Sequence, residues 1–212
     1  MRKIFWSWLV AAIVILSAAA FLLRRQPDLS RYEELVQPRI TNMNSQWMLV
    51  VRERGNPNLA AKHAFRLLFK TYYRYADKHE KKNFKAPRAR WPLINLQDTS
   101  MKTWEGQYGI PVSDSFPVPK EDGVKLEKWE YGSTAEILHK GSYASEPATV
   151  QKLIRFIEDH RYQIIGEHEE EYLRGPGMFF RGNPGGYLTI IRYRVITGGV
   201  EGTLSQSTPS GK

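Results

Sequence analysis

The sequence predicts an α+β fold built from two βαββ repeats and preceded by one transmembrane helix. Residues 4–23 form an apolar run without a charged side chain. The rest of the chain alternates twice through a β-rich segment, a glycine turn, an amphipathic helix and further β-rich segments. The two halves keep nearly equal spacing, since Gly55 and Gly141 lie 86 residues apart and Tyr108 and Tyr193 lie 85 apart. This matched spacing favours an internal duplication.

Composition limits the class of protein. The chain has 212 residues, 42% of them hydrophobic and 25% charged, which supports a packed core and excludes a wholly disordered chain. It contains no cysteine, so disulfide scaffolds, thiol catalysis and iron–sulfur clusters are excluded. Its net charge of +9 is compatible with nucleic acid, with anionic lipid or with a merely soluble surface.

The apolar run of residues 4–23 is predicted to cross a membrane. Twenty residues suffice for a hydrocarbon core of about 30 Å, and basic pairs flank the run at Arg2–Lys3 and Arg24–Arg25. A cleaved signal peptide is the alternative, because residues 17–20 are small. We interpret the run as an uncleaved anchor because Phe21–Leu23 continue it to the double arginine. The basic flanks nearly balance, and the short N-terminal tail slightly favours an extracytoplasmic domain.

Residues 24–45 are predicted to form a juxtamembrane linker, because they are polar, contain two prolines and show no sustained period. One helical turn is expected within it at Ser30–Val36. The first repeat then begins with the β-rich run Trp47–Val51. A helix follows, because Pro57 suits a first turn and apolar residues recur at steps of three and four until about Lys78. Two further strands are expected at residues 91–96 and 102–112.

The second repeat has the same order of elements. Its first strands are expected to end before Gly141, and Ser145 is the expected N-cap of a helix with one apolar face. The folded domain is therefore predicted to cover residues 46–197, and the Gly-, Ser- and Thr-rich residues 198–212 are predicted to be a disordered tail. The expected elements are strands at 126–131, 133–139, 169–173 and 187–196 and a helix at about 146–160.

The stretch Gly132–Val195 resembles the GyrI-like family, an effector-binding module with a SOUL-like βαββ duplication that also occurs in AraC-type and MerR-type regulators. Residues 135–143 (AEILHKGSY) are similar to its strand leading into H-x-G-x-Y, residues 170–173 (EEYL) to its E-x-Y-L strand, and residues 187–191 to its closing strand. The resemblance implies a pseudo-twofold axis and a central cleft that binds lipophilic, often cationic aromatic compounds. It also implies that Glu170 is the glutamate of that cleft.

Glu170 and Tyr172 would share one face of a strand, while the neighbouring glutamates would point to the other face. A half-buried glutamate there would attract a cation or act as a general base, whereas the alternative is an exposed acidic strand. Trp104 and Tyr108 share a face of the corresponding strand in the first repeat, where cation–π contact would suit a flat cation and core packing is the alternative. The predicted ligand-binding residues are Glu170, Tyr172, Trp104 and Tyr108.

Three functions follow from these residues. The first is a membrane-anchored domain that binds a lipophilic, cationic or aromatic small molecule in the cleft. The second is a hydrolase of strained or electrophilic small molecules, in which Glu170 would activate water and Tyr172 would orient it. The third is a tethered protein-interaction module.

Motifs for other chemistry are missing from the sequence. We find no Walker loop, dinucleotide fingerprint or nucleophile elbow, and the histidines show no metal-ligand spacing, so neither cofactor nor metal is predicted. His139 is expected to be a structural residue at a strand end. The segment Lys78–Arg90 carries six basic residues against Glu80 and is expected to be a solvated loop. A contact for anionic lipid headgroups is the first alternative, and nucleic acid is the less favoured one.

Overall fold

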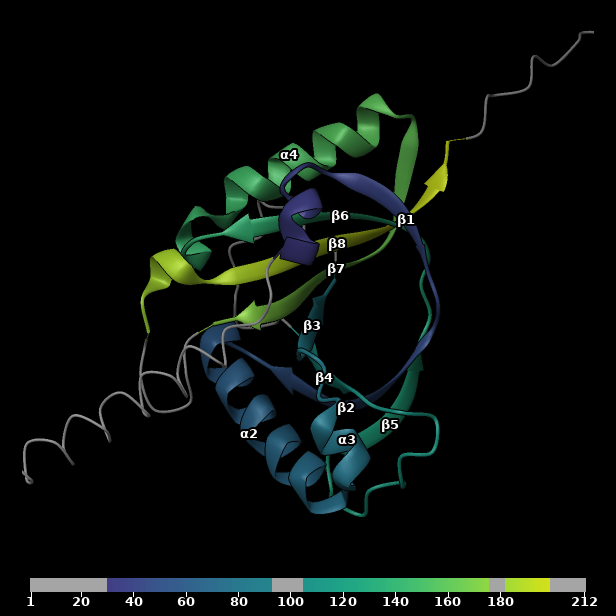
Figure 1. Ribbon diagram of the computed structural model, residues 1–212, viewed down its shortest axis with the longest axis vertical. Coiled ribbons are helices and arrows are strands. Elements are labelled where there is room, and N and C mark those ends of the chain that lie inside the picture. The colour runs from purple at the N-terminus through teal and green to yellow at the C-terminus, as the bar shows by residue number, and fades with distance from the viewer. Residues whose placement is uncertain (1–29, 93–104, 176–181, 199–212) are drawn as a thin grey trace, which may run out of the picture. The chain divides into compact units, whose positions relative to one another are not determined.

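The computed structural model describes residues 30–92, 105–175 and 182–198 (Figure 1). The chain divides into two units, Met1–Glu34 and Leu35–Lys212. The 3-10 helix η1 (Ser30–Val36) lies where one helical turn is predicted. The predicted membrane segment, residues 4–23, falls outside the described residues. Among the residues that are described, no helix has the length and hydropathy needed to cross a membrane.

Eight described strands form one antiparallel sheet in the order β1-β6-β8-β7-β3-β4-β2-β5. The sheet combines two matching sets, since β6-β8-β7 and β2-β4-β3 have the same order and meet where β7 pairs with β3. The strands are β1 (Arg39–Met43), β2 (Gln46–Arg54), β3 (Arg88–Trp91), β4 (Glu105–Pro111), β5 (Val124–Trp129), β6 (Gly132–Lys140), β7 (Tyr162–Arg174) and β8 (Leu188–Thr197).

The two βαββ repeats predicted from the spacing are confirmed by this topology. Helix α2 (Pro57–Tyr75) follows β2, and helix α4 (Glu146–Asp159) follows β6. In both repeats the strand–helix turn contains a glycine at positive φ, Gly55 at 109° and Gly141 at 134°, a conformation that side chains disfavour. The edge strands also correspond, because β5 pairs with β2 as β1 pairs with β6.

Both long helices cover one face of the sheet, which we call the helix-covered face (Figure 1). Leu68 and Tyr72 of α2 are fully buried against β2 and β4, and Leu153 and Ile157 of α4 are buried against β6 and β8. Each such aliphatic side chain contributes about 1.5–3 kcal/mol by leaving water. The opposite face of the sheet, here the second face, carries Met48 and other buried residues (Val50, Trp129 and Tyr131).

The structure corrects several predicted boundaries. Residues 39–43, assigned to the linker, form β1, where the Arg39 guanidinium contacts Glu136 at 2.9 Å. Its polar sequence lacks the hydrophobic pattern of a strand because β1 lies at the edge of the sheet. Strand β3 begins at Arg88 rather than at residue 91, and β7 begins at Tyr162 rather than at residue 169.

The basic segment Lys78–Arg90 does not form one loop. It begins with the short helix α3 (Lys78–Lys82) and ends in β3. Arg88 and Arg90 are buried on the second face, in ion pairs with Glu171 and Glu169 respectively, so they are not available to contact lipid headgroups. The exposed residues of the segment include the lysines at positions 78, 81, 82 and 85.

Candidate functional site

Glu170 lies at the centre of the sheet on the helix-covered face. In β7 it pairs with Ile191 of β8 on one side and with Ala89 of β3 on the other. Ile191 packs under α4 and Ala89 packs in the cluster under α2, so Glu170 is a charged residue in an apolar row between the two helices. Only 9% of its surface is exposed. Glu170 and Tyr172 share this face as predicted, while Glu169 and Glu171 point to the second face.

A second carboxylate and a histidine contact Glu170. His168 Nε2 lies 3.1 Å from Glu170 Oε1 and 3.8 Å from Glu146 Oε1, and the two glutamates are joined by a hydrogen bond. Glu146 is the first residue of α4 and is 7% exposed. His168 Nδ1 is 2.7 Å from the hydroxyl of Tyr193, and the Tyr172 hydroxyl donates a hydrogen bond to Glu170. We call Glu146, His168 and Glu170 the carboxylate–histidine cluster.

The three groups of the cluster shift one another's pKa values in different directions. Burial raises the pKa of Glu146 above its usual value, and the nearby charge of Glu170 adds to this effect. Burial is the largest influence on Glu170 and acts against its ionisation, but the hydrogen bond and the charge of His168, together with Tyr172 and Glu146, outweigh burial and lower the pKa of Glu170. Burial disfavours the charged form of His168 too, yet its bonds to both glutamates raise the pKa of His168 well above its usual value. Glu146 is therefore the carboxyl that keeps its proton to the higher pH.

Aromatic rings extend from the cluster toward both repeats. The Tyr172 ring contacts Phe65 at 5.8 Å and Tyr143 at 6.1 Å between centroids, in edge-to-face geometry. Further contacts join Phe65 to Tyr108 and Tyr108 to Trp91, whose indole N–H lies 3.4 Å from Glu170 Oε1. Burial and the charges of Glu53 and Glu170 raise the pKa of Tyr108 to about 12. The edge of this aromatic set at Tyr143 is 39% exposed, whereas Tyr108 is 1% exposed.

The structure brings only some of the predicted site residues together. Glu170 and Tyr172 lie together, and Tyr108 is buried in the core beside Phe65 and Trp91. Trp104 falls outside the described residues. His139 has the structural role expected of it, because Nδ1 is 2.8 Å from Thr149 Oγ1 and Nε2 is 3.0 Å from the Ser142 carbonyl, which ties β6 to the start of α4.

The carboxylate–histidine cluster also has the chemistry of a metal-binding site. One donor atom from each of Glu146, His168 and Glu170 lies within 4.8 Å of the others. Imidazole and carboxylate ligands suit Zn²⁺ and related divalent ions. The Tyr193 hydroxyl at Nδ1 would fix the histidine tautomer, as outer-sphere partners do. The sequence did not predict this group because Glu146 lies 22 residues before His168 on a helix.

Charged side chains on the second face form a continuous row across the sheet. Through the strand register, Glu136 pairs with Arg192, Arg192 with Glu169, and Glu169 with Arg90. Ion pairs accompany each step, at 2.9 Å for Arg192–Glu136, 3.4 Å for Arg192–Glu169 and 2.7 Å for Arg90–Glu169. Opposite charges facing one another across strands stabilise the pairing.

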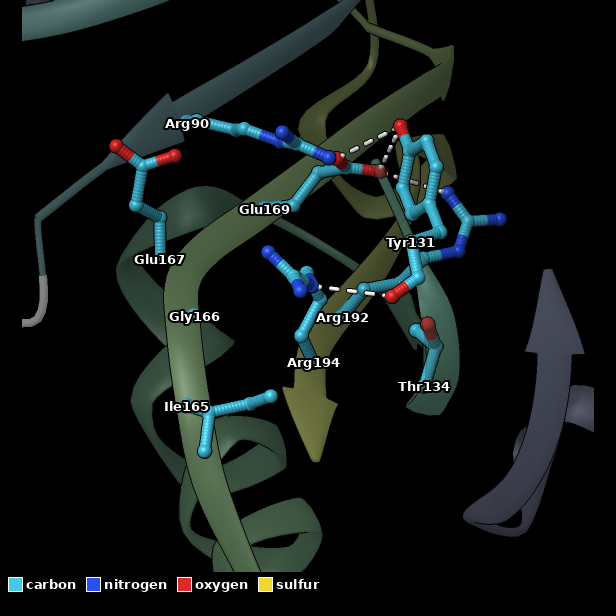
Figure 2. Close-up of a pocket in the computed structure, with 9 residues that line it drawn as sticks. All are labelled: Arg90, Tyr131, Thr134, Ile165, Gly166, Glu167, Glu169, Arg192 and Arg194. Carbon is cyan, nitrogen blue, oxygen red and sulfur yellow. Dashed lines mark hydrogen bonds and ion pairs between the residues drawn. The ribbon is translucent and has the colours of Figure 1, made fainter. Parts of the chain in front are cut away.

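A hollow of about 170 Å³ opens beside this charged row (Figure 2). It lies on the second face, and Glu170 and Tyr172 do not line it, so it is separate from the predicted cleft residues. Its lining residues are Arg90, Tyr131, Thr134, Ile165, Gly166, Glu167, Glu169, Arg192 and Arg194.

No protein-family model matches the sequence, and no match was found among curated proteins. The fold is similar to that of several solved structures. An uncharacterized conserved protein from Listeria innocua gives a TM-score of 0.61 at 17% identity, covering 79% of this chain and 98% of that one. A hydrolase from Listeria innocua gives 0.57 at 16% identity, covering 76% and 92%. The EcmrR C-terminal domain gives 0.59 at 12% identity, covering 76% and 98%. These likenesses establish the fold.

Proposed function

We propose that this domain binds a lipophilic, cationic aromatic small molecule at the carboxylate–histidine cluster, between α2 and α4. One observation carries the proposal: Glu170, in a row of otherwise apolar strand residues, lies within 4.8 Å of a second buried carboxylate, Glu146 at the start of α4. Like charges this close disfavour each other's ionisation unless a proton or a cation lies with them. The cluster is therefore suited to exchange a proton for a cation.

The charge that attracts the ligand comes from Glu146 as much as from Glu170. His168, whose pKa is raised, already compensates the ionised Glu170. Loss of the proton from Glu146 then gives the cluster a net negative charge. A bound cation would favour that ionised form, so its affinity is expected to increase as the pH rises through the raised pKa of Glu146.

The aromatic residues around the cluster supply the apolar part of the interaction. A cation over a tyrosine or tryptophan ring gains about 0.5–2 kcal/mol. Tyr143 is the exposed ring of the set and contacts both Tyr172 and Tyr187. We therefore place the entry to the site at Tyr143.

The test measures binding of rhodamine 6G, an aromatic cation, to the full-length chain in detergent. Glu146→Gln and Glu170→Gln are compared with wild type, and Glu158→Gln is the control because Glu158 is exposed on the same helix. All variants share the same detergent background, so dye uptake by micelles cancels. Each cluster variant is expected to weaken binding about tenfold, and Glu146→Gln is expected to remove the pH dependence. Equal affinity in all four proteins would refute the proposal.

A hydrolase on the same residues is the second candidate, and the opposite pKa shifts of Glu146 and Glu170 favour it. Carboxyls shifted in opposite directions suit the roles of general acid and general base. Glu170 would take a proton from water as the water oxygen bonds to an electrophilic carbon. Glu146 would give its proton to the group that leaves or to the ring atom that opens. Tyr172, hydrogen-bonded to Glu170, would help to orient the water.

Mass spectrometry separates the two candidates. The full-length chain is incubated with strained and electrophilic compounds, and addition of one water to a compound identifies hydrolysis. Product that disappears in Glu170→Gln while binding persists would establish the enzyme. Neither product nor binding over a broad panel would favour a protein-interaction module instead.

We propose further that residues 4–23 anchor this domain to a membrane, with the domain on the extracytoplasmic side. The apolar run and its basic flanks support this. The exposed lysines of the segment Lys78–Arg90 would then be available to anionic headgroups.

A further inference from the structure

The hollow on the second face is formed by an irregularity in β7. Ile164 pairs with Val195 and His168 pairs with Tyr193, so residues 165–167 of β7 lie opposite the single residue Arg194 of β8. Such bulges bend a strand and re-aim its side chains. Here the bulged residues and Arg194 together line the hollow.

Gly166 lets the arginine lie against the bulge. A Cβ at this position would be 2.8 Å from Arg194 Cβ and 3.2 Å from Arg194 Cγ, which is too close for any side chain without movement. The aliphatic part of Arg194 thus packs on the backbone of β7, and its guanidinium is directed into the hollow (Figure 2).

Arg194 differs from the other arginines of the hollow in its partners. Arg90 contacts Glu169 at 2.7 Å and lies 3.9 Å from the centre of the Trp129 ring. Arg192 contacts three glutamates (Glu136, Glu169 and Glu171). The partner of Arg194 is the backbone carbonyl of Tyr131, 3.0 Å from Nε, and within the described part of the chain no carboxylate pairs with it.

The surroundings of Arg194 favour an anion with an apolar substituent. Three arginines and two glutamates line the hollow, and Glu169 is already shared by Arg90 and Arg192. At its rim Ile165 is 46% exposed, although it belongs to a strand of the central sheet. A guanidinium binds a carboxylate or a phosphate through two parallel hydrogen bonds, and Arg194 Nη1 and Nη2 provide such a pair.

We propose that this hollow binds a small oxyanion, a carboxylate or a phosphate, that carries an apolar substituent. Arg194 holds the anionic group, and Ile165 packs against the substituent. The site lies on the face of the sheet opposite to the carboxylate–histidine cluster, so it is independent of the function proposed above. The volume of the hollow, about 170 Å³, suits a small molecule rather than a polymer.

Phenyl phosphate tests the site on the full-length chain in detergent. Its dissociation constant is measured by calorimetry for wild type, Arg194→Gln and Arg155→Gln, at constant ionic strength. Arg155 is the matched control because it is exposed on α4, against the other face of the sheet. Wild type and Arg155→Gln are expected to bind with a constant near or below about 1 mM, and Arg194→Gln at least about tenfold more weakly.

Two further comparisons sharpen the result. Ile165→Ser is expected to weaken the binding of phenyl phosphate but to leave the binding of inorganic phosphate unchanged, since inorganic phosphate has no apolar group. Replacing the detergent by nanodiscs with and without phosphatidic acid shows whether a lipid phosphate competes for Arg194 with phenyl phosphate. Binding that is equal in wild type and Arg194→Gln, or absent from wild type, would overturn the proposal.

Discussion

Neutralising Glu169 should weaken the fold by several kcal/mol. Its side chain is 4% exposed and accepts hydrogen bonds from Arg90 at 2.7 Å, Tyr131 at 2.9 Å and Arg192 at 3.4 Å. Glu169→Gln keeps the size of the side chain but removes the charge that compensates these buried arginines. Breaking a buried ion pair from one side costs about 3–5 kcal/mol.

The lower end of that range is expected, because Arg192 keeps a contact with Glu171 at 2.6 Å and Arg88 keeps one at 3.2 Å. For a domain of this size, 1 kcal/mol corresponds to about 2–4 °C in Tm. The variant should therefore melt about 6–12 °C below wild type.

Thermal unfolding of the full-length chain, followed by tryptophan fluorescence, measures this change. Glu167→Gln is the matched control, since Glu167 lies on the same face of β7 and accepts a hydrogen bond from the neutral Gln107 at 2.7 Å. Glutamine keeps an oxygen that can accept this bond, so the control is expected to lose no more than about 1 kcal/mol. If the two variants lower Tm equally, the charge on Glu169 is not what stabilises the second face.

Three other predictions concern stability and location. Because the pKa of His168 is raised in the fold, its charge contributes stability that is complete below pH 6.5 and is lost as the pH rises through the raised value. His168→Gln should reduce this loss of stability at alkaline pH, measured by urea titrations at successive pH values. An unchanged dependence of stability on pH would contradict the prediction. Leu153→Ala, which removes a fully buried side chain under α4, should cost about 2–5 kcal/mol in the same titrations, and a cost below about 1 kcal/mol would show that the packing there is loose. Deleting residues 4–23 should move the protein from the membrane fraction to the soluble fraction of cells, and retention in the membrane fraction would refute the anchor.

Much of the fold was predictable from local patterns. The helices at 57–75 and 146–159 were found because their apolar residues recur at helical spacing, and the glycines at 55 and 141 mark turns that need positive φ. Strand β1 was missed because an edge strand need not bury either of its faces. Strand β7 was predicted too short because the bulge at residues 165–167 interrupts the alternation of buried and exposed residues.

The site was predictable only in part. Alternation along a strand placed Glu170 and Tyr172 on one face, and this is confirmed. Glu146 and His168 were not predicted as partners of Glu170, because the contact depends on how the start of α4 packs over the sheet. Arginines at alternate positions, 88 and 90 in one strand and 192 and 194 in another, were the available sign of a charged face, but they were assigned to a surface loop or left without a role.

The sequence by itself determined which side chains share a face, because the period of a strand and of a helix depends on backbone geometry alone. It also predicted the duplication, since the equal spacing of corresponding residues in the two halves can be read without any knowledge of packing. Only the tertiary structure decided which faces meet and in what register. That register places Glu169 between Arg90 and Arg192, and it places Glu170, one residue later, in an apolar row beneath two helices. The contributions of these neighbouring glutamates to stability differ because burial and the partners across the strands set those contributions. Both burial and partners depend on contacts between residues far apart in the chain.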